Sequence, residues 1–463
     1  MGPPLVKVED SLAARGAEGT PTAEGTSPTM MQQTSPTVEG AVSSDGDAEV
    51  TALSSTDMDL ACEPDTSFDD GEPVGLSLLA LPPELLLAIL EFLEAGFVVR
   101  TLSLVCKKLQ RLIANAATWK IRIGKRWPKQ YPVIPVDDEV FNWQLACMER
   151  EAQHRLWSNV TEMEYFCLGP GHFGEIDSVH LMQGGDLCIS GSRDRSFHLW
   201  DLRRLDISNP AESTEASKLK SVDSHKGWVW HVTSKDNIVC TSSWDKCIRL
   251  WDMEADCAEV CGFSGNSAFL CSVLHQHEVH AAAYDKHVYI FDRRDRNQGG
   301  RSKLLLHRMP VLSLASDDQY IISASEDKTV AVFDRRAGQL LKKVELEKFP
   351  LCMSYGQGQL WVGRNDGQIS VIDPTQGKFD LLQTYDVGHT YKVTGIQHGL
   401  GSVMTCSTDC TIKIHEPNHE PSTIRTIDDL SSVSSIHTCN DVLAAGGSDL
   451  YVRIWRPSRQ PAD

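Results

Sequence analysis

The stretch Asn237–Asp252, NIVCTSSWDKCIRLWD, decides the fold because it contains two short strand-like runs around one turn residue. An apolar run at 238–240 precedes Asp245, and an alternating run that begins at Cys247 ends in Trp251. Short β-prone runs on either side of a turn residue are typical of a β-hairpin. One hairpin would say little about the fold, but this one recurs along the chain.

The recurring feature is the turn aspartate, which is followed six residues later by a large, cyclic or aliphatic side chain. The turn aspartates are Asp194, Asp245, Asp285, Asp327, Asp366, Asp409 and Asp449. Successive members lie 39 to 51 residues apart, and the longest step contains a Ser/Glu-rich insert at 209–220. A period of about 40–45 residues with four strands per unit is typical of a β-propeller.

These repeats resemble the WD-repeat family, whose dipeptide is intact at Trp200-Asp201 and Trp251-Asp252 and degenerate elsewhere. The resemblance covers residues 165–456 and implies a seven-bladed β-propeller. The last repeat has no outer strand of its own, and a strand-like stretch at 164–168 precedes the first repeat. We therefore expect the two ends to pair in one blade, which would leave the ring without an open edge.

Ahead of the repeats, residues 76–119 are rich in leucine at helical spacing, and Pro82 with Pro83 predicts a helix start. We expect Gly96 to break this helical run. The stretch resembles an F-box in its Leu-Pro-x-Glu-Leu start at Leu81, its Leu-x-x-Val-Cys-x-x-Leu centre and its closing Trp119. About 40 residues in short helices cannot bury this much leucine alone, so a partner is expected.

In the F-box family the partner is the Skp adaptor, which connects the F-box to a cullin–RING ubiquitin ligase. The resemblance implies adaptor contacts at Leu81, Pro82, Leu85, Ile89, Val105, Cys106 and Trp119. The alternative is a small helical bundle that packs on its own propeller.

The domain order predicted from these features is a mainly β protein with a small all-α part. The predicted parts are a disordered acidic Ser/Thr/Pro-rich tail (1–74), the F-box (75–122), a linker with a spacer helix (123–160), the seven-bladed WD-repeat propeller (161–458) and a short tail (459–463). The spacer helix, within 137–157, is expected to use Phe141, Leu145, Met148, Ala152 and Leu156 as one face. In this order the modules resemble the F-box/WD-repeat substrate receptors.

Composition limits the classes of function. The net charge of −19 disfavours a general nucleic-acid surface. The 14 cysteines are scattered without a CxxC pair, which favours reduced thiols in a cytoplasmic or nuclear protein. No run approaches the roughly 18 apolar residues of a membrane-spanning helix, and no signal peptide is evident. We expect no membrane association and no cofactor.

Blade two contains a histidine, a serine and an aspartate, which raises the hypothesis of a hydrolase. The WD-repeat resemblance instead implies a buried structural tetrad of His225, Ser242, Asp245 and Trp251, because buried polar groups need partners. By the same register, Gly191 in blade one and Cys406 in blade six stand in place of the serine. His275, His277 and His280 have no neighbouring ligand at metal spacing, so no metal site is expected.

The predicted interaction surface is the upper rim of the propeller, formed by the residue before each turn aspartate and two residues at the start of each innermost strand. The residues expected to bind a substrate are Trp228, Trp230, Trp244, Tyr284, Leu312, Phe349 and Arg193. Related receptors that read phosphorylated segments place several arginines on this face. Here Arg193 and Lys392 are the only cations among the predicted rim positions, so we expect an apolar or aromatic segment with no strict need for phosphorylation.

The sequence thus favours a non-catalytic substrate receptor of an F-box ubiquitin ligase, in which the F-box binds the adaptor and the rim binds an unidentified protein substrate. A WD-repeat scaffold that takes no part in ubiquitin transfer is the alternative. A hydrolase that uses blade two is the third and least favoured hypothesis.

Overall fold

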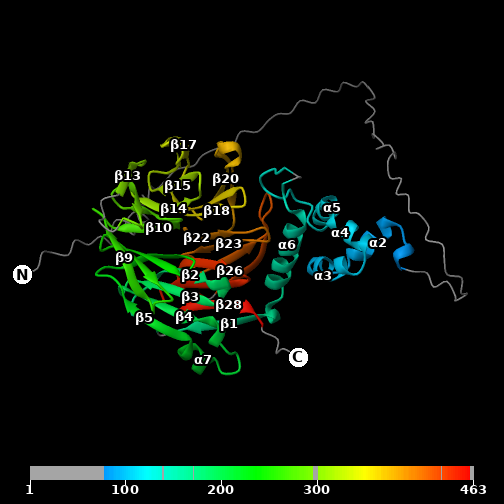
Figure 1. The fold of residues 1–463 in the computed structure, drawn as a ribbon, viewed down its shortest axis with the longest axis horizontal. Coiled ribbons are helices and arrows are strands. Elements are labelled where there is room, and N and C mark those ends of the chain that lie inside the picture. Colours follow the sequence, from blue (N-terminus) through cyan, green and yellow to red (C-terminus); the bar gives the residue numbers. More distant parts are fainter. Residues whose placement is uncertain (1–77, 138–139, 170, 296–300, 429, 459–463) are drawn as a thin grey trace, which may run out of the picture. The chain divides into compact units, whose positions relative to one another are not determined.

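The computed structural model describes residues 78–137, 140–169, 171–295, 301–428 and 430–458. The predicted tails at 1–74 and 459–463 lie outside these residues. The described part contains a helical region followed by seven four-stranded antiparallel sheets (Figure 1). None of its helices is both long and apolar enough to cross a bilayer.

The helical region begins at the two prolines, as predicted, because Pro82 is the N-cap of the first α-helix and Pro83 its first residue. The break falls earlier than expected: the chain turns at 91–94, and Gly96 lies inside the next helix. The short elements are η1 (Leu78–Ala80), α2 (Pro83–Leu90), α3 (Ala95–Arg100), η2 (Leu102–Leu104), α4 (Lys107–Ala114) and α5 (Ala116–Arg126). They pack around one core that includes Leu90, Val98, Leu109, Ile113 and Trp119.

The predicted spacer helix is α6 (Trp143–Ser158). The predicted face is confirmed in part: Phe141 and Met148 pack against the helical core, whereas Leu145 is exposed. Trp143, Ala146 and Cys147, which were not predicted, are buried in the same core. The C-terminal end packs elsewhere: Leu156 and Trp157 join the core of the last two blades. A single apolar stripe could not serve both contacts, so the buried positions change along the helix.

The seven sheets are the blades. In blades one to six the strands lie in chain order from the centre outward, whereas the outermost strand of blade seven comes from an earlier part of the chain. Their strands are β2 (Ile176–Met182), β3 (Leu187–Ser192), β4 (Ser196–Asp201) and β5 (Lys218–Asp223) in blade one; β6 (Val229–Lys235), β7 (Ile238–Ser243), β8 (Cys247–Asp252) and β9 (Ala258–Ser264) in blade two; β10 (Phe269–His275), β11 (Glu278–Ala283), β12 (His287–Asp292) and β13 (Arg301–Leu305) in blade three; β14 (Val311–Ser316), β15 (Tyr320–Ser325), β16 (Thr329–Asp334) and β17 (Gln339–Glu345) in blade four; β18 (Pro350–Gly356), β19 (Gln359–Arg364), β20 (Gln368–Asp373) and β21 (Asp380–Asp386) in blade five; β22 (Val393–His398), β23 (Val403–Ser407), β24 (Ile412–His415) and β25 (Thr423–Ile427) in blade six; and β26 (Val433–Cys439), β27 (Val442–Gly447) and β28 (Val452–Pro457) in blade seven.

The predicted closure of the ring is confirmed. Strand β1 (Met163–Leu168) pairs antiparallel with β28 and completes blade seven, with Tyr165 opposite Trp455. Arg456 reinforces this joint: its guanidinium donates to Glu164 at 2.8 Å and to the carbonyls of Leu202 and Leu205. The first and last segments of the propeller are therefore held in one sheet, and β1 covers the edge that β28 would otherwise leave open.

The insert of the first repeat also has structure. The Ser/Glu-rich stretch forms a short helix, α7 (Pro210–Ser217), which starts at a proline and leads directly into β5. The extra length therefore lies between the third and fourth strands of blade one and leaves the repeat intact.

Candidate functional site: a buried hydrogen-bond network, an apolar helical surface and an aromatic rim

The polar residues of blade two form one buried network. The imidazole of His225 contacts Asp245 at 2.9 Å through Nδ1 and the Thr241 hydroxyl at 2.7 Å through Nε2. The indole nitrogen of Trp251 donates to the same hydroxyl at 2.9 Å. Each side chain in this series of hydrogen bonds, from Asp245 through His225 and Thr241 to Trp251, thus has a partner, as burial requires.

The hydroxyl in this network corrects the predicted tetrad, because Thr241 and not Ser242 contacts the histidine. Ser242 points the other way and donates to Ser272 of blade three at 2.7 Å. Successive side chains of a strand face opposite sides, so a slip of one residue exchanges the two faces. The hydrolase hypothesis loses its geometry as well, since the serine does not reach the histidine.

The same correction restores the tetrad in blade one, where Gly191 was expected to replace the serine. His172 contacts Asp194 at 2.8 Å and Ser190 at 2.8 Å, and Trp200 donates to Ser190. In blade six, Thr405 rather than Cys406 occupies the hydroxyl position, and His415 takes the place of the tryptophan.

The pKa values of the turn aspartates Asp245 and Asp327 are lowered by their hydrogen bonds. Burial alone would raise the pKa of Asp245, but hydrogen bonds from His225 and from the amides of Lys226 and Cys247 outweigh it and lower the pKa to about 2. Burial would also raise the pKa of Asp327. Hydrogen bonds from the Thr329 hydroxyl and the Arg308 amide outweigh burial and lower this pKa to about 2. The aspartates stabilise their turns as charged acceptors.

Blade one places a second histidine beside its tetrad. His198 stacks on His172 with ring centroids 3.7 Å apart, and these rings with Asp194 bring three possible metal ligands close together. The ring planes are nearly parallel, so their in-plane lone pairs do not converge on one point. We interpret the group as stacking on a hydrogen-bonded tetrad.

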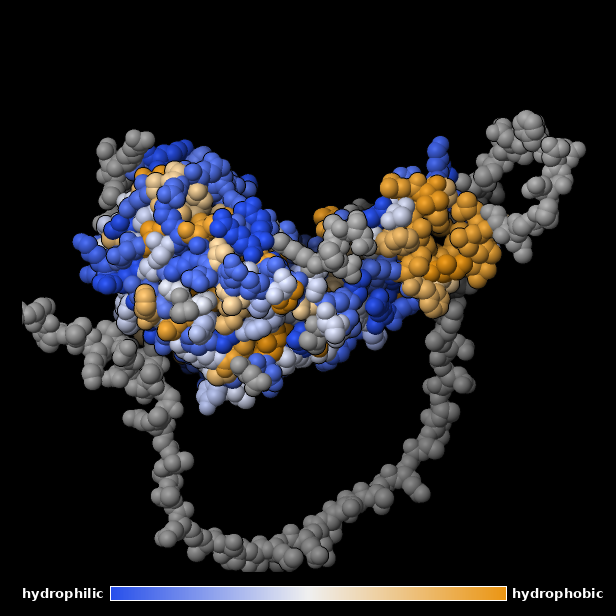
Figure 2. Space-filling model, turned by 90° about the horizontal axis from the view of Figure 1, so that it is seen from below, coloured by the Kyte–Doolittle hydropathy of each residue, from blue (hydrophilic) through white to orange (hydrophobic). Residues whose placement is uncertain are grey.

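The helical region exposes an unusual amount of apolar surface. Figure 2 shows a broad hydrophobic patch at the end of the molecule formed by α2 to α4. Among the predicted adaptor residues, Leu85, Ile89 and Val105 are exposed, Val105 by 63%. Pro82 is exposed too, and Leu81 and Cys106 are half-buried. Contiguous apolar surface of this kind marks an interaction site.

Trp119 is a correction to the predicted adaptor set. Its side chain is 1% exposed and lies in the helical core, where the indole nitrogen donates to the Ile113 carbonyl at 2.7 Å. A tryptophan that both fills a core and satisfies its donor is a structural residue.

Sequence reasoning also missed exposed members of the apolar surface. Phe92 and Leu104 are 92% and 81% exposed. Phe92 continues the helical spacing of Leu85 and Ile89, which was the available signal.

The rim of the propeller has a regular backbone geometry. In each blade, the amide of the residue before the turn aspartate donates to the carbonyl just before the innermost strand, as in Trp244 to Trp228 at 3.0 Å and Tyr284 to Ala268 at 2.9 Å. The same bond joins Arg193 to Glu175 in blade one. The repeating bond brings the two kinds of predicted rim position together in every blade.

Four of the predicted rim aromatics form one cluster. The ring of Trp244 lies 6.0 Å from Trp228, 5.6 Å from Trp230 and 5.8 Å from Tyr284, with edge-to-face or tilted planes. The three tryptophans are half-buried, and Tyr284 is exposed. We refer to Trp228, Trp230, Trp244 and Tyr284 as the rim cluster. Leu312 and Phe349 are half-buried at the corresponding positions of blades four and five.

Arg193 lies against the rim cluster. Its guanidinium carbon is 5.1 Å from the ring centre of Trp228 and 5.8 Å from that of Trp230. The same group pairs with Asp177 through Nε at 3.0 Å and with Glu175 through Nη2 at 2.8 Å. The rim therefore combines apolar ring surface with a cation whose charge is compensated within the protein.

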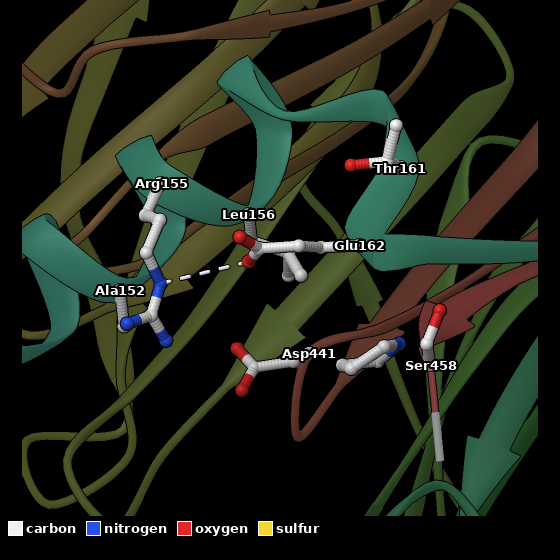
Figure 3. A pocket seen from close by; sticks show the side chains of 8 residues that line it. Ala152, Arg155, Leu156, Thr161, Glu162, Asp441 and Ser458 are labelled. Atoms are coloured by element: carbon white, nitrogen blue, oxygen red, sulfur yellow. Dashed lines mark ion pairs between the residues drawn. The ribbon is translucent and has the colours of Figure 1, made fainter. Parts of the chain in front are cut away.

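A pocket of about 470 Å³ lies where α6 meets blade seven (Figure 3). Arg155 and Glu162 form an ion pair at its wall, with 3.6 Å between the paired atoms, and Asp441 faces them. Strand β27 (Val442–Gly447), which is about 20 Å long at the usual rise per residue, lies between Asp441 and the turn at Asp449. The pocket is therefore at the opposite end of the blade from the rim.

Comparison with known proteins agrees with both parts of this architecture. The model of the F-box-like family matches residues 78–122, and that of the WD domain, G-beta repeat, matches 165–201, 216–252 and 302–334. F-box/WD repeat-containing protein 9 from Bos taurus is 40% identical over 85% of this chain and 87% of its own length. The chain belongs to the F-box/WD-repeat protein family.

Two further F-box/WD-repeat proteins are similar over most of the chain. The Homo sapiens F-box/WD repeat-containing protein 9 is 41% identical over 82% of each chain. The Caenorhabditis elegans F-box/WD repeat-containing protein mec-15 is 26% identical over 73% of this chain and 86% of its own length. The apolar helical surface and the rim thus belong to two distinct modules of an F-box/WD-repeat chain.

Proposed function

We propose that this chain is the substrate-recognition subunit of a Skp–cullin–F-box ubiquitin ligase. The apolar surface of α2 to α4 binds the Skp adaptor, and the rim of the propeller binds the protein to be ubiquitinated. The observation that carries the proposal is the exposure of Leu85, Phe92, Leu104 and Val105 in the segment that matches the F-box-like family. A partner that covers these side chains removes apolar surface from water.

In this proposal the chain makes and breaks no covalent bond. Its contribution is proximity: it holds a substrate lysine near the ubiquitin-charged enzyme bound elsewhere on the complex. The tetrad histidines and aspartates support this role, because their side chains are engaged in hydrogen bonds that stabilise the blades. Function in the cytoplasm or nucleus, without nucleic acid or membrane, is part of the same proposal.

The test is co-purification with the Skp adaptor and a cullin. Truncating a buried interface anchor commonly costs about 2 kcal/mol, so Leu85→Ala with Val105→Ala should weaken adaptor binding by several hundred-fold if the two effects add. Both side chains are exposed in the free chain, so the fold should be retained. Leu145→Ala, an exposed leucine on α6, is the matched control.

The same experiment also distinguishes a ubiquitin-ligase subunit from a WD-repeat scaffold. Unchanged adaptor binding in the double variant would contradict the assigned surface. Binding to the adaptor without any recruitment of a cullin would favour a WD-repeat scaffold that takes no part in ubiquitin transfer.

A further inference from the structure

Two carboxylates hold Arg193 at the rim. Its guanidinium makes three hydrogen bonds to the two carboxylate oxygens of Asp177, at 3.0 to 3.3 Å. Glu175 pairs with the same group at 2.8 Å. The pairing places the cation against Trp228 and Trp230 instead of leaving it extended into solvent.

Asp177 is the better shielded of the two carboxylates. Its side chain is 7% exposed, whereas the side chain of Glu175 is 41% exposed. Burial raises the pKa of Asp177 to about 6, against the hydrogen bonds from Arg193, which lower it. The three hydrogen bonds to Asp177 hold the guanidinium in one geometry, whereas Glu175 adds a single ion pair from a solvated side chain.

The pairing of Arg193 limits the ligands that the rim can accept. A free guanidinium fork is the group best suited to phosphate and carboxylate ligands. Here an incoming anion would have to replace Asp177, and the displaced carboxylate would remain shielded without its cation. An apolar side chain that packs on the exposed ring of Tyr284 and on the accessible parts of the half-buried tryptophans carries no charge, so it does not have to break the pair of Arg193 with Asp177.

We propose that Asp177 is the specificity-determining residue of the rim, because it withholds Arg193 from anionic ligands and leaves the rim to neutral segments with aromatic or aliphatic anchors. This inference rests on the proposed substrate-binding role of the rim. The recognised partner is therefore a protein segment whose central side chains are apolar and unphosphorylated.

The experiment selects peptides from a random displayed library on the full chain bound to its adaptor and immobilised through the adaptor. The wild-type complex should enrich peptides with Trp, Phe or Leu and should not enrich Asp or Glu. Asp177→Asn keeps the shape of the side chain and removes its charge. This variant should enrich acidic peptides, and those peptides should bind it about fivefold more tightly than the wild type.

Three control variants make the result specific. Asp177→Asn combined with Arg193→Met should lose the gain for acidic peptides, because the released cation is absent. Glu326 precedes the turn Asp327 and its amide makes the rim hydrogen bond of blade four, to the carbonyl of Pro310. Glu326→Gln removes this rim carboxylate and should leave the selection unchanged. Trp228→Ala with Trp244→Ala should lose the apolar peptides, which shows that the selected peptides bind the rim cluster.

The outcomes distinguish the substrate-binding role of the rim from the role of Asp177. Recovery of the same peptides by the double tryptophan variant would overturn the substrate-binding role of the rim, and with it this inference. Rim-dependent selection that Asp177→Asn leaves unchanged would overturn the role of Asp177 alone. Enrichment of acidic peptides by the wild type would also overturn the role of Asp177.

Discussion

At the scale of single residues, the hydroxyl of Thr241 is the centre of the blade-two network. It has hydrogen bonds with both His225 and Trp251, at 2.7 and 2.9 Å. Thr241→Val keeps the shape and removes both bonds, so we expect a loss of about 1–3 kcal/mol in the free energy of unfolding. Urea unfolding measures the loss, and Thr241→Ser, which keeps the hydroxyl, should lose less. Equal losses in the two variants would contradict the assignment of the hydroxyl.

The pH dependence of stability follows from the charged turn aspartates. The folded pKa of Asp245, about 2, is below the value near 3.9 for an unfolded aspartate. Its contribution is therefore present above pH 4 and is lost as the pH falls toward 2, at most about 2–3 kcal/mol for this residue. Melting temperatures at pH 7 and pH 3 should differ less in Asp245→Asn than in the wild type. An equal difference would exclude Asp245 as a contributor.

At the scale of elements, α6 is the piece that joins the helical region to the propeller. Glu151 binds Arg122 at 2.7 Å and the Ala95 amide at 2.8 Å on the helical side. Arg150 lies between the rings of Trp127 and Tyr131 and donates to Asn418 of blade six. The helix is therefore fixed on both sides by buried polar contacts, which have specific geometry.

The close approach of α6 to blade six requires a glycine at position 401. A Cβ added to Gly401 would lie 2.6 Å from the carbonyl oxygen of Glu149 in α6, whereas one added to Gly399 has its nearest neighbour at 3.9 Å. Gly401→Ala should therefore lower the free energy of unfolding by about 1–3 kcal/mol, because helix backbone cannot move aside as a side chain can. Limited proteolysis between α5 and α6 should increase in parallel. Gly399→Ala is the matched control, and equal behaviour of the two variants would refute the contact.

At the scale of the whole molecule, the rim and the apolar helical surface should be separable by mutation. The rim cluster lies at the turn-aspartate ends of the blades, and α6 contacts the loops at their other ends, such as that of Ser402. Trp228→Ala with Trp244→Ala should therefore abolish substrate capture and leave adaptor binding unchanged. Proximity labelling in cells, with adaptor co-purification in parallel, measures both. Loss of substrate capture on phosphatase treatment would contradict recognition through apolar side chains.

The repeat pattern was enough to predict the propeller. The seven turn aspartates set the blade number, and the missing outer strand of the last repeat set the pairing of β1 with β28. These features are local or periodic, so they are visible in the order of residues alone. The rim positions follow from the same register, because every blade repeats one backbone hydrogen bond between them.

The contacts that depend on the direction of a side chain were decided only by the tertiary structure. Thr241 and Ser242 are adjacent hydroxyl residues on one strand, and only packing against the next blade shows which one meets His225. Trp119 belongs to an F-box-like motif, yet its indole fills the core. The pairing of Arg193 with Asp177 joins a turn to the innermost strand of its blade, 16 residues apart. Sequence specifies which residues recur, whereas three-dimensional packing decides which neighbour satisfies each of them.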